Sequence, residues 1–270
     1  MLIVAATPIG NLGDHTPRLV ETLSSAALIV AEDTRTTKKL IGALGVTTGA
    51  DFLPLHEHNE NEQIDKVLSV AASSTVVLVS DAGMPGISDP GFALVREAHR
   101  RGISVSPLPG PSAVISALSA SGLPTDRFSF EGFIPKKGKS GALSALATEK
   151  RTMVFFESPH RLADTLHVMS EVFGADRMAC VARELTKMFE EVRTDTLSAL
   201  AEHYAEGTKG EITLVVEGFH GQEVSFDQAV ADARQRVDAG ERASDVAREI
   251  AKETGYSKRE LYSALLGGDA

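Results

Sequence analysis

The segment SDAGMPGISDPG, residues 80–91, places acidic residues among glycines and prolines directly after the apolar run TVVLV. The run predicts a buried strand, so Asp81 is expected at the end of that strand, where its carboxylate can accept hydrogen bonds or face a cation. Gly83 and Gly86 let the backbone approach a ligand closely. The segment has no lysine and lacks the phosphate-binding pattern G-x-x-x-x-G-K-[ST], so it favours a cationic ligand.

S-adenosylmethionine is a ligand that suits such a segment. Its sulfonium and ammonium groups are positively charged, and its adenine needs backbone polar partners and an apolar slot. A tight turn leading into a helix would explain Asp89, Pro90 and Gly91 by itself. It does not explain why the nine preceding residues are so rich in glycine and proline.

Other ligand classes fit the sequence less well. GFIPKKGKSG, residues 132–141, resembles a nucleotide-binding loop, but Gly132 is one residue too far from Gly138. The dinucleotide pattern G-x-G-x-x-G is absent. His56 and His58 could suggest a metal, but no further cysteine or histidine cluster completes a ligand set, so no metal is expected.

The elements that must position these residues alternate along the first part of the chain. Strands are predicted at residues 2–6, 27–32, 75–79 and 103–107, and helices at 16–25, 34–45, 60–72, 90–101 and 111–122. Asp89 is the predicted N-cap of the helix at 90–101, and Pro90 its first residue. The alternation predicts a parallel α/β sheet with crossover helices, which binds ligands at the carboxyl ends of its strands.

A second α/β lobe and a helical tail are predicted to follow. Strands are expected at 127–133, 152–157, 177–184 and 211–219, and helices at 159–174, with Ser158 as its cap, and 196–207. The predicted domains are therefore 1–122, 123–222 and a helical extension at 223–270, with a ligand cleft between the first two. The last two tail helices, with Gly255 in the turn, have the shape of a helix-turn-helix, which can bind DNA or pack as a small bundle.

Composition and charge bound the function further. The 270 residues carry a formal net charge of −10, which argues against a general polyanion binder. No signal peptide or membrane-spanning segment is apparent, and Cys180 is the only cysteine, so a cytoplasmic location is expected. Lys136, Lys137 and Lys139 are predicted to form a basic patch in an exposed loop, where they could contact a phosphate backbone.

Several motifs together resemble one known family. In chain order they are ATPIGNLGD (6–14), AEDTR (31–35), SDAGMPGISDPG, PLPGPSAV (107–114), FESPHR (156–161), ARELTK (182–187) and KGEITLVVEG (209–218). Together they resemble the small-subunit (16S) ribosomal RNA (cytidine 2′-O) ribose methyltransferases, a branch of the tetrapyrrole-methylase superfamily. The resemblance covers roughly residues 1–220, and the tail is similar to an extension of that branch. It implies a two-lobed tetrapyrrole-methylase-like fold, a homodimer, and S-adenosylmethionine in the cleft.

The resemblance also implies which residues contact the cofactor. They are Pro8, Asp81, Met84, Ser112, Ala113, Phe156, Arg183 and Glu211. Ala82 departs from the proline usual in the superfamily, and that departure is typical of the RNA-modifying branch. Taken singly, Pro8 could be a turn residue, Met84 and Phe156 core residues, and Ser112 a helix cap.

The reaction implied is an in-line methyl transfer to a ribose 2′-hydroxyl, helped by alignment, desolvation and a positioned base. Asp33, Glu184 and Lys187 are the candidate catalytic residues. Candidate substrate contacts are Arg35, His56, His58, Asn59, Lys136, Lys137 and Arg161. The expected substrate is RNA at the decoding centre of the small ribosomal subunit, with no metal and no membrane involved. The alternatives are a tetrapyrrole or other small-molecule methylase, and a non-enzymatic regulator that binds DNA through its tail.

Overall fold

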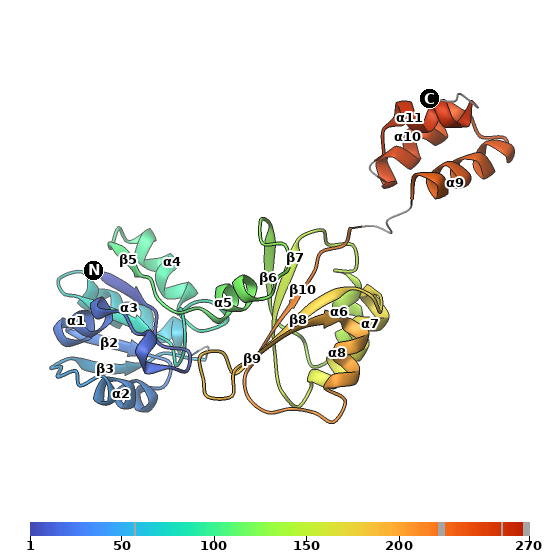
Figure 1. Cartoon of the computed structure of the whole chain (residues 1–270). Coiled ribbons are helices and arrows are strands. Elements are labelled where there is room, and N and C mark those ends of the chain that lie inside the picture. The colour runs from blue at the N-terminus through green and yellow to red at the C-terminus, as the bar shows by residue number, and fades with distance from the viewer. Residues whose placement is uncertain (57, 221–224, 255, 267–270) are drawn as a thin grey trace. The chain divides into compact units, whose positions relative to one another are not determined.

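The computed structural model describes residues 1–56, 58–220, 225–254 and 256–266 (Figure 1). The chain divides into two compact units. The larger comprises Met1–Ser144 and Arg151–Glu217, and the smaller comprises Ala145–Lys150 and Gly218–Ala270. The predicted boundary between residues 222 and 223 lies outside the described residues.

The first lobe of the larger unit is built on a parallel sheet with strand order β3-β2-β4-β1-β5. Its strands are β1 (Leu2–Ala5), β2 (Leu28–Ala31), β3 (Asp51–Pro54), β4 (Val76–Val79) and β5 (Val105–Leu108). Its helices are the 3-10 helix Leu12–Asp14, α1 (Pro17–Ser25), α2 (Thr34–Ala43), α3 (Glu60–Ala71) and α4 (Phe92–Arg100). The parallel pairing confirms the predicted crossover topology.

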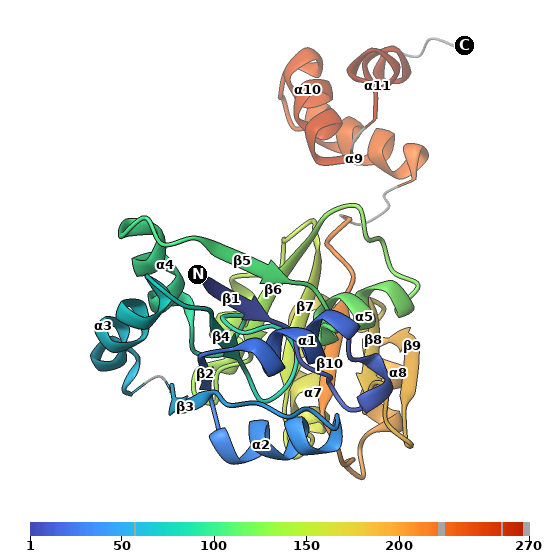
Figure 2. The ribbon, with the colours of Figure 1, turned by 90° about the vertical axis from the view of Figure 1, so that its left-hand side faces the viewer.

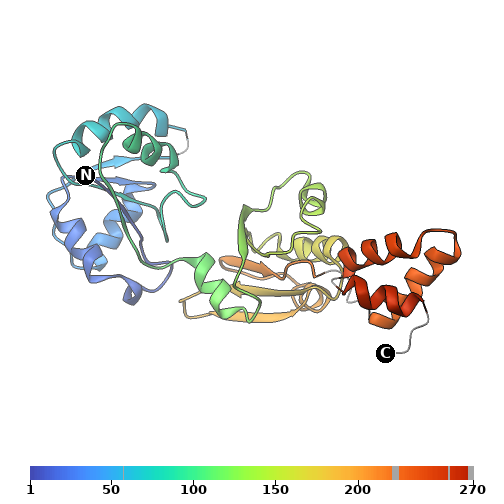
Figure 3. The same cartoon turned by 90° about the horizontal axis from the view of Figure 1, so that it is seen from above.

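Alternating strand residues divide the first lobe into two hydrophobic layers. One set, which includes Val30 and Leu78, is buried against α3 and α4. The other set, which includes Ile29 and Val77, is buried against α1 and α2. Figure 3 shows these helix pairs on opposite sides of the blue and cyan sheet. Strands covered on both faces read as continuous apolar runs, and this is why the sequence identified β1, β2 and β4. The edge strand β3 was not predicted, because only Leu53 is buried in it.

The second lobe contains a mixed sheet with strand order β6-β7-β10-β8-β9. The strands are β6 (Phe128–Phe133), β7 (Thr152–Glu157), β8 (Met178–Arg183), β9 (Glu191–Thr196) and β10 (Ile212–Val216). β6 and β7 are parallel and the other neighbours are antiparallel. The polar edge strand β9 was not predicted; its sequence EVRTDT has no apolar run. In Figure 2 the first lobe lies in front of the second, and α7 and α8 lie near the second sheet.

The helices of the second lobe are α5 (Ala113–Ala120), α6 (Lys139–Ser144), α7 (Leu162–Phe173) and α8 (Leu197–His203). Although α5 precedes the predicted boundary at residue 122, its Val114, Ala117 and Leu118 are buried in one cluster with residues of β7, β8 and β10. Defined by packing, the second lobe therefore begins with α5, and the link between the lobes is the loop between β5 and α5.

The smaller unit contains the predicted tail helices, α9 (Phe226–Asp238), α10 (Ala243–Thr254) and α11 (Lys258–Leu265). They enclose their own core, which includes Ala233, Val246, Ile250 and Leu261. Gly255, predicted in the turn between the last two helices, lies outside the described residues. Among the helices described in either unit, none has the length and apolar character needed to cross a bilayer.

Candidate active site

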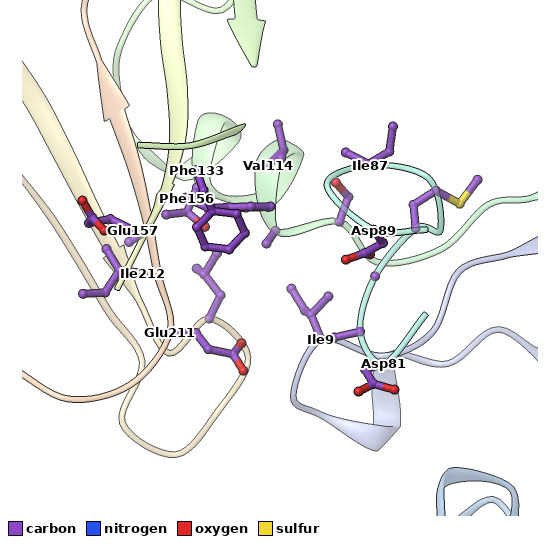
Figure 4. A pocket seen from close by; sticks show the side chains of 18 of the residues that line it. Ile9, Asp81, Ile87, Asp89, Val114, Phe133, Phe156, Glu157, Glu211 and Ile212 are labelled. Atoms are coloured by element: carbon purple, nitrogen blue, oxygen red, sulfur yellow. The ribbon is translucent and has the colours of Figure 1, made fainter. Parts of the chain in front are cut away.

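The larger unit contains a cavity of about 450 Å³, a size within the range of small-molecule sites. It opens where loops at strand ends of both sheets meet, and Figure 4 shows the side chains that line it. Its lining from the first lobe is Ile9, Glu32, Asp81, Ala82, Gly83, Met84, Ile87 and Asp89. Its lining from the second lobe is Ser112, Ala113, Val114, Phe133, Phe156, Glu157, Ser158, Pro159, Ala182, Leu185, Gly210, Glu211, Ile212 and Thr213.

Backbone hydrogen bonds fix the loop after β4 against the loop after β1. Thr7 and Gly83 exchange backbone hydrogen bonds of 2.9 and 3.1 Å, and the Thr7 hydroxyl donates to the Ser80 carbonyl. Gly83 has a φ of 77°, a conformation that L side chains rarely adopt. The residues that follow TVVLV therefore form one wall of the cavity, at the predicted carboxyl edge of the sheet.

Three carboxylates lie on the first-lobe side of the cavity, from Glu32, Asp81 and Asp89. Burial raises the pKa of Asp81, and burial together with the neighbouring charge of Glu32 raises the pKa of Asp89 to about 6. Within the part of the chain that the structure describes, none of the three is within ion-pair distance of a lysine or arginine. This wall therefore carries carboxylates that no described lysine or arginine pairs with directly, although the charge of Arg35 acts on Asp81 from a distance.

The structure corrects the predicted role of Asp89. α4 begins at Phe92 rather than at Pro90, and its N-cap is Gly91, whose φ is 131°. The capping acceptor is Glu60 Oε1, which accepts hydrogen bonds from the backbone amides of Gly91 and Leu94 at 3.2 and 3.0 Å. Because a residue on another helix supplies this cap, the Asp89 carboxylate lies in the cavity instead (Figure 4).

The predicted start of the next lobe's main helix is corrected in the same way. α7 begins at Leu162, so Ser158 and Pro159 are not its cap and first residue. Ser158 instead donates its amide to Glu157 Oε1 at 2.6 Å and accepts a turn hydrogen bond from the Arg161 amide. Both residues consequently line the cavity. In both loops a polar residue followed by proline belongs to the site rather than to the helix start.

Arg161, predicted as a phosphate contact, is engaged within the protein. Its Nη2 donates to Glu157 Oε2 at 2.7 Å and to the Ile134 carbonyl at 2.6 Å. The Glu157 side chain is only 1% exposed and also accepts from the Thr165 hydroxyl at 2.6 Å. Arg161 therefore balances a buried charge and fixes the loop after β7.

A second charged cluster lies beside the cavity, in the loop between β8 and β9. Lys187 Nζ is 2.8 Å from Glu184 Oε1 and 3.2 Å from Glu211 Oε2. Hydrogen bonding to Lys187 lowers the pKa of Glu184; burial lowers the pKa of Lys187, but its hydrogen bonds to Glu184 and Glu211 outweigh burial and raise it. Lys187 is therefore a protonated cation at neutral pH. A Cβ added at Gly10 would lie 2.5 Å from Lys187 Cγ, so this loop is tightly packed against the first lobe.

The structure brings six of the predicted cofactor residues together. They are Asp81, Met84, Ser112, Ala113, Phe156 and Glu211. Ser112 also caps α5 by accepting from the Ile115 amide, so both of its predicted readings coexist. Pro8 and Arg183 do not line the cavity, although their neighbours Ile9 and Ala182 do. The Arg183 guanidinium pairs with Glu191 at 3.1 Å and so faces a structural partner.

Other predicted site residues lie outside the cavity lining. Asp33 caps α2 through the Arg35 amide and also pairs with the Arg35 guanidinium, whose hydrogen bond lowers the pKa of Asp33 to about 2. The rings of His56 and His58 lie 6.0 Å apart in the loop after β3. Asn59 holds that loop by accepting from the His56 amide and donating to the Pro54 carbonyl.

The predicted basic patch is smaller than expected. Lys136 and Lys137 are exposed in the loop after β6. The Lys139 side chain is only 11% exposed, and its Nζ binds Asp164 and Thr165 at 2.5 and 2.7 Å. Lys139 is therefore a structural residue of α6 rather than part of the exposed patch.

Several lining residues were not predicted as site residues, chiefly Ile87, Asp89, Val114 and Phe133. A signal for Asp89 exists in the sequence, since it lies in the same acidic loop as Asp81. The sequence contains no such signal for Phe133, because the strand pattern of β6 does not reveal which face of the sheet its last residue occupies. In the described residues, no group of three or more histidine, cysteine, aspartate and glutamate side chains could hold a metal ion.

The cavity fits S-adenosylmethionine by its chemistry. Carboxylates on one wall suit a ligand that carries a sulfonium and an ammonium group. Ile9, Val114 and Phe156 provide apolar surface for a purine ring. Asp81, Asp89 and Glu32 would face the cationic groups, and the cofactor when bound would supply the activated methyl group.

Comparison with known proteins agrees with this chemistry. Residues 1–201 match the family described as Tetrapyrrole (Corrin/Porphyrin) Methylases. The chain is 44% identical to Ribosomal RNA small subunit methyltransferase I of Mesorhizobium japonicum, covering 98% of this chain and 91% of that protein. It is 43% identical to the protein of that name from Pseudomonas aeruginosa, covering 98% and 96%. The solved structure of a diphthine synthase superposes with a TM-score of 0.61 at 16% identity, covering 80% and 89%, and so shares the fold.

The two curated relatives match over 98% of the chain. A methyltransferase of the tetrapyrrole-methylase type uses S-adenosylmethionine, and that agrees with the acidic and apolar walls of the cavity. The chain therefore belongs to the ribosomal RNA small subunit methyltransferase I family, within the tetrapyrrole methylases.

Proposed function

We propose that this S-adenosylmethionine-dependent methyltransferase methylates the 2′-hydroxyl of a cytidine ribose in small-subunit ribosomal RNA, at the decoding centre. The names of its relatives support ribosomal RNA of the small subunit as the substrate class. The observation that carries the proposal is the cavity itself, which joins three carboxylates to exposed apolar side chains at Ile87 and Phe133. Lys136 and Lys137 are exposed three and four residues after Phe133. The carboxylates suit a cationic methyl donor, and the exposed apolar side chains and lysines suit an RNA acceptor.

The residues of the chain would contribute mainly by positioning. Walls from both lobes exclude water and align the acceptor oxygen with the methyl group, and alignment of this kind lowers a reaction barrier substantially. Of the candidate catalytic residues, Glu184 and Lys187 adjoin the cavity through Glu211, whereas Asp33 is paired with Arg35 and has a pKa of about 2. We therefore assign the catalytic cluster to Glu184 and Lys187. The Lys187 ammonium would orient the carboxylates of Glu184 and Glu211.

The remaining substrate contacts follow from their exposure. Lys136 and Lys137 would bind the phosphate backbone, and Arg35 and the loop of His56, His58 and Asn59 would contact more distant RNA. The assembled small subunit would be the acceptor, because a chain of net charge −10 is poorly suited to bind RNA by bulk electrostatics. A cytoplasmic homodimer that works without a metal completes the proposal.

The test offers radiolabelled S-adenosylmethionine with each of three acceptors: small ribosomal subunits, unrelated naked RNA, and a tetrapyrrole. We expect label in the ribosomal RNA alone. Equal labelling of unrelated RNA would contradict recognition of the assembled subunit. Labelling of the tetrapyrrole instead would support the small-molecule alternative and overturn the RNA substrate.

A further inference from the structure

Phe133, the last residue of β6, is an aromatic side chain that lines the cavity although 64% of its surface is exposed. A β-bulge places it there. Phe130 pairs with Val154 and Phe133 pairs with Phe156, so β6 has one residue more than β7 between these pairs. The extra residue turns Phe133 onto the same face as Phe130, and regular alternation would turn it to the opposite face. Bulges beside functional sites commonly redirect a side chain in this way.

Phe133 completes an aromatic series that runs from the core to the mouth of the cavity. The ring of Phe156 lies 4.9 Å from that of Phe130 and 5.3 Å from that of Phe133. Phe130 and Phe156 pack against the buried cluster beneath α5. Phe133 is thus supported from one side by a fixed ring, while its own surface remains open.

An aliphatic residue stands on the other side of the mouth. Ile87, in the loop after β4, lines the same cavity and is 49% exposed. Figure 4 shows Ile87 and Phe133 on opposite sides of the opening, with Val114 between them. The loop of Ile87 closely approaches the bulge, because a Cβ added at Gly132 would lie 3.7 Å from Ser88 Oγ. Two exposed apolar side chains therefore flank the opening.

Two exposed lysines follow Phe133 closely in the chain. Lys136 and Lys137 follow Phe133 by three and four residues and have no ion-pair partner in the described part of the chain. A flat ring attached to a phosphate backbone is the chemistry of a nucleotide, and proteins bind unpaired bases by stacking them on exposed aromatic side chains near basic residues. Figure 4 shows Asp81 at the other end of the cavity from Ile87 and Phe133, so the cationic cofactor and the nucleic acid would occupy different parts of the cavity.

We propose that Phe133 and Ile87 form a stacking slot for an unpaired base of the RNA substrate, either the cytosine of the nucleotide whose ribose is methylated or a neighbouring base. This inference rests on the proposed function, because it assigns the position of that substrate. Phe133 would act as a positioning residue that holds the base while the ribose reaches the methyl group.

The test compares three variants in the full-length chain. Phe133→Ala removes the ring, Phe133→Tyr keeps it, and Phe92→Ala is the matched control. Phe92 is a phenylalanine that is 65% exposed on α4 and does not line the cavity. Binding of small ribosomal subunits to the cofactor-loaded protein, S-adenosylmethionine affinity by calorimetry, and methyl transfer are measured for each.

We expect Phe133→Ala to weaken subunit binding about ten-fold or more and to leave cofactor affinity unchanged, with Phe133→Tyr and Phe92→Ala close to the unmodified protein. Loss of cofactor affinity without loss of subunit binding would make Phe133 part of the adenine site and overturn the inference. Unchanged binding in Phe133→Ala would also overturn it. If the unmodified protein binds subunits through Phe133 but transfers no methyl group to them, the proposed function fails while the slot remains.

Discussion

Glu60 Oε1 lies 3.2 Å from the amide nitrogen of Gly91 and caps α4 from the start of α3. The same oxygen accepts the amide of Leu94, so one carboxylate satisfies two of the free amides at the start of α4. A Cβ at Gly91 would lie 2.8 Å from Leu78 Cδ2, so the backbone packs closely against Leu78 at this point. These hydrogen bonds fix the end of the 80–91 loop, whose acidic side chains Asp81 and Asp89 line the cavity.

Replacing Glu60 should therefore destabilise the fold and loosen the cofactor loop. We expect Glu60→Ala to lower the free energy of unfolding by about 1 kcal/mol, as for the loss of an N-cap. Glu62→Ala, an exposed glutamate in the same first turn of α3, is the control and should change little. Urea denaturation measures both, and equal stability of the two variants would contradict the capping role.

Cofactor affinity should depend on the ionisation of Asp89. Burial and the charge of Glu32 raise the pKa of Asp89 to about 6, so its carboxylate gains its charge as the pH rises through that value. The affinity for the cationic cofactor should rise over the same range, and Asp89→Asn should weaken binding about ten-fold at neutral pH and flatten this rise. Calorimetric titrations over a pH series test it, and an unchanged pH dependence in Asp89→Asn would refute it.

Although Asp89→Asn should weaken cofactor binding, it should make the folded chain more stable. Because the pKa of Asp89 is raised on folding, the folded chain retains a proton that the unfolded chain has lost, and stability falls as the pH rises from about 4 to about 6. Asp89→Asn should then increase the free energy of unfolding at neutral pH by about 1 kcal/mol, a figure reduced for solvent screening. Thermal denaturation measures this gain, and a lower melting temperature would contradict it.

Arg161 should matter for folding rather than for RNA affinity. Arg161→Ala leaves the Glu157 carboxylate buried without its cation, and the cost should be about 3 kcal/mol. The double variant Glu157→Gln with Arg161→Met removes both charges and should recover much of that loss. If Arg161→Ala is as stable as the unmodified chain but binds subunits with a weaker salt dependence, the guanidinium contacts phosphate after all.

Substitutions of Lys187 and Asp33 should separate the candidate catalytic residues. Lys187→Met removes the cation shared by Glu184 and Glu211, and we expect kcat to fall about ten-fold or more. Asp33→Asn should leave kcat nearly unchanged, because Asp33 is paired with Arg35 outside the cavity lining. Single-turnover methyl transfer compares them, and the reverse ranking would return the catalytic role to Asp33.

The sequence predicted what depends on local pattern. Buried strands such as β4 are continuous apolar runs, and the glycine-rich loop after it lines the cavity as expected. The tail helices likewise follow from their spacing of apolar residues.

The errors at Asp89, Lys139 and Phe133 share one physical cause, which is contact between residues distant in the chain. Asp89 and Ser158 each precede a proline and carry every local signal of a helix cap, but Glu60 supplies one cap and neither residue begins a helix. Lys139 lies in a basic run yet is paired with Asp164. Phe133 reaches the cavity only because of a bulge against β7, which no pattern within β6 reveals.

The position of the transferred methyl group distinguishes ribose methylation from every alternative acceptor. The purified chain is incubated with radiolabelled S-adenosylmethionine and small ribosomal subunits that lack the decoding-centre ribose methyl group, and the RNA is then hydrolysed with alkali. A 2′-O-methyl group blocks cleavage of the adjoining phosphodiester, so we expect label in an alkali-resistant dinucleotide that begins with cytidine. Label in mononucleotides would show methylation of a base, and an unlabelled RNA would show that the acceptor lies elsewhere; either result would overturn ribose methylation by this chain.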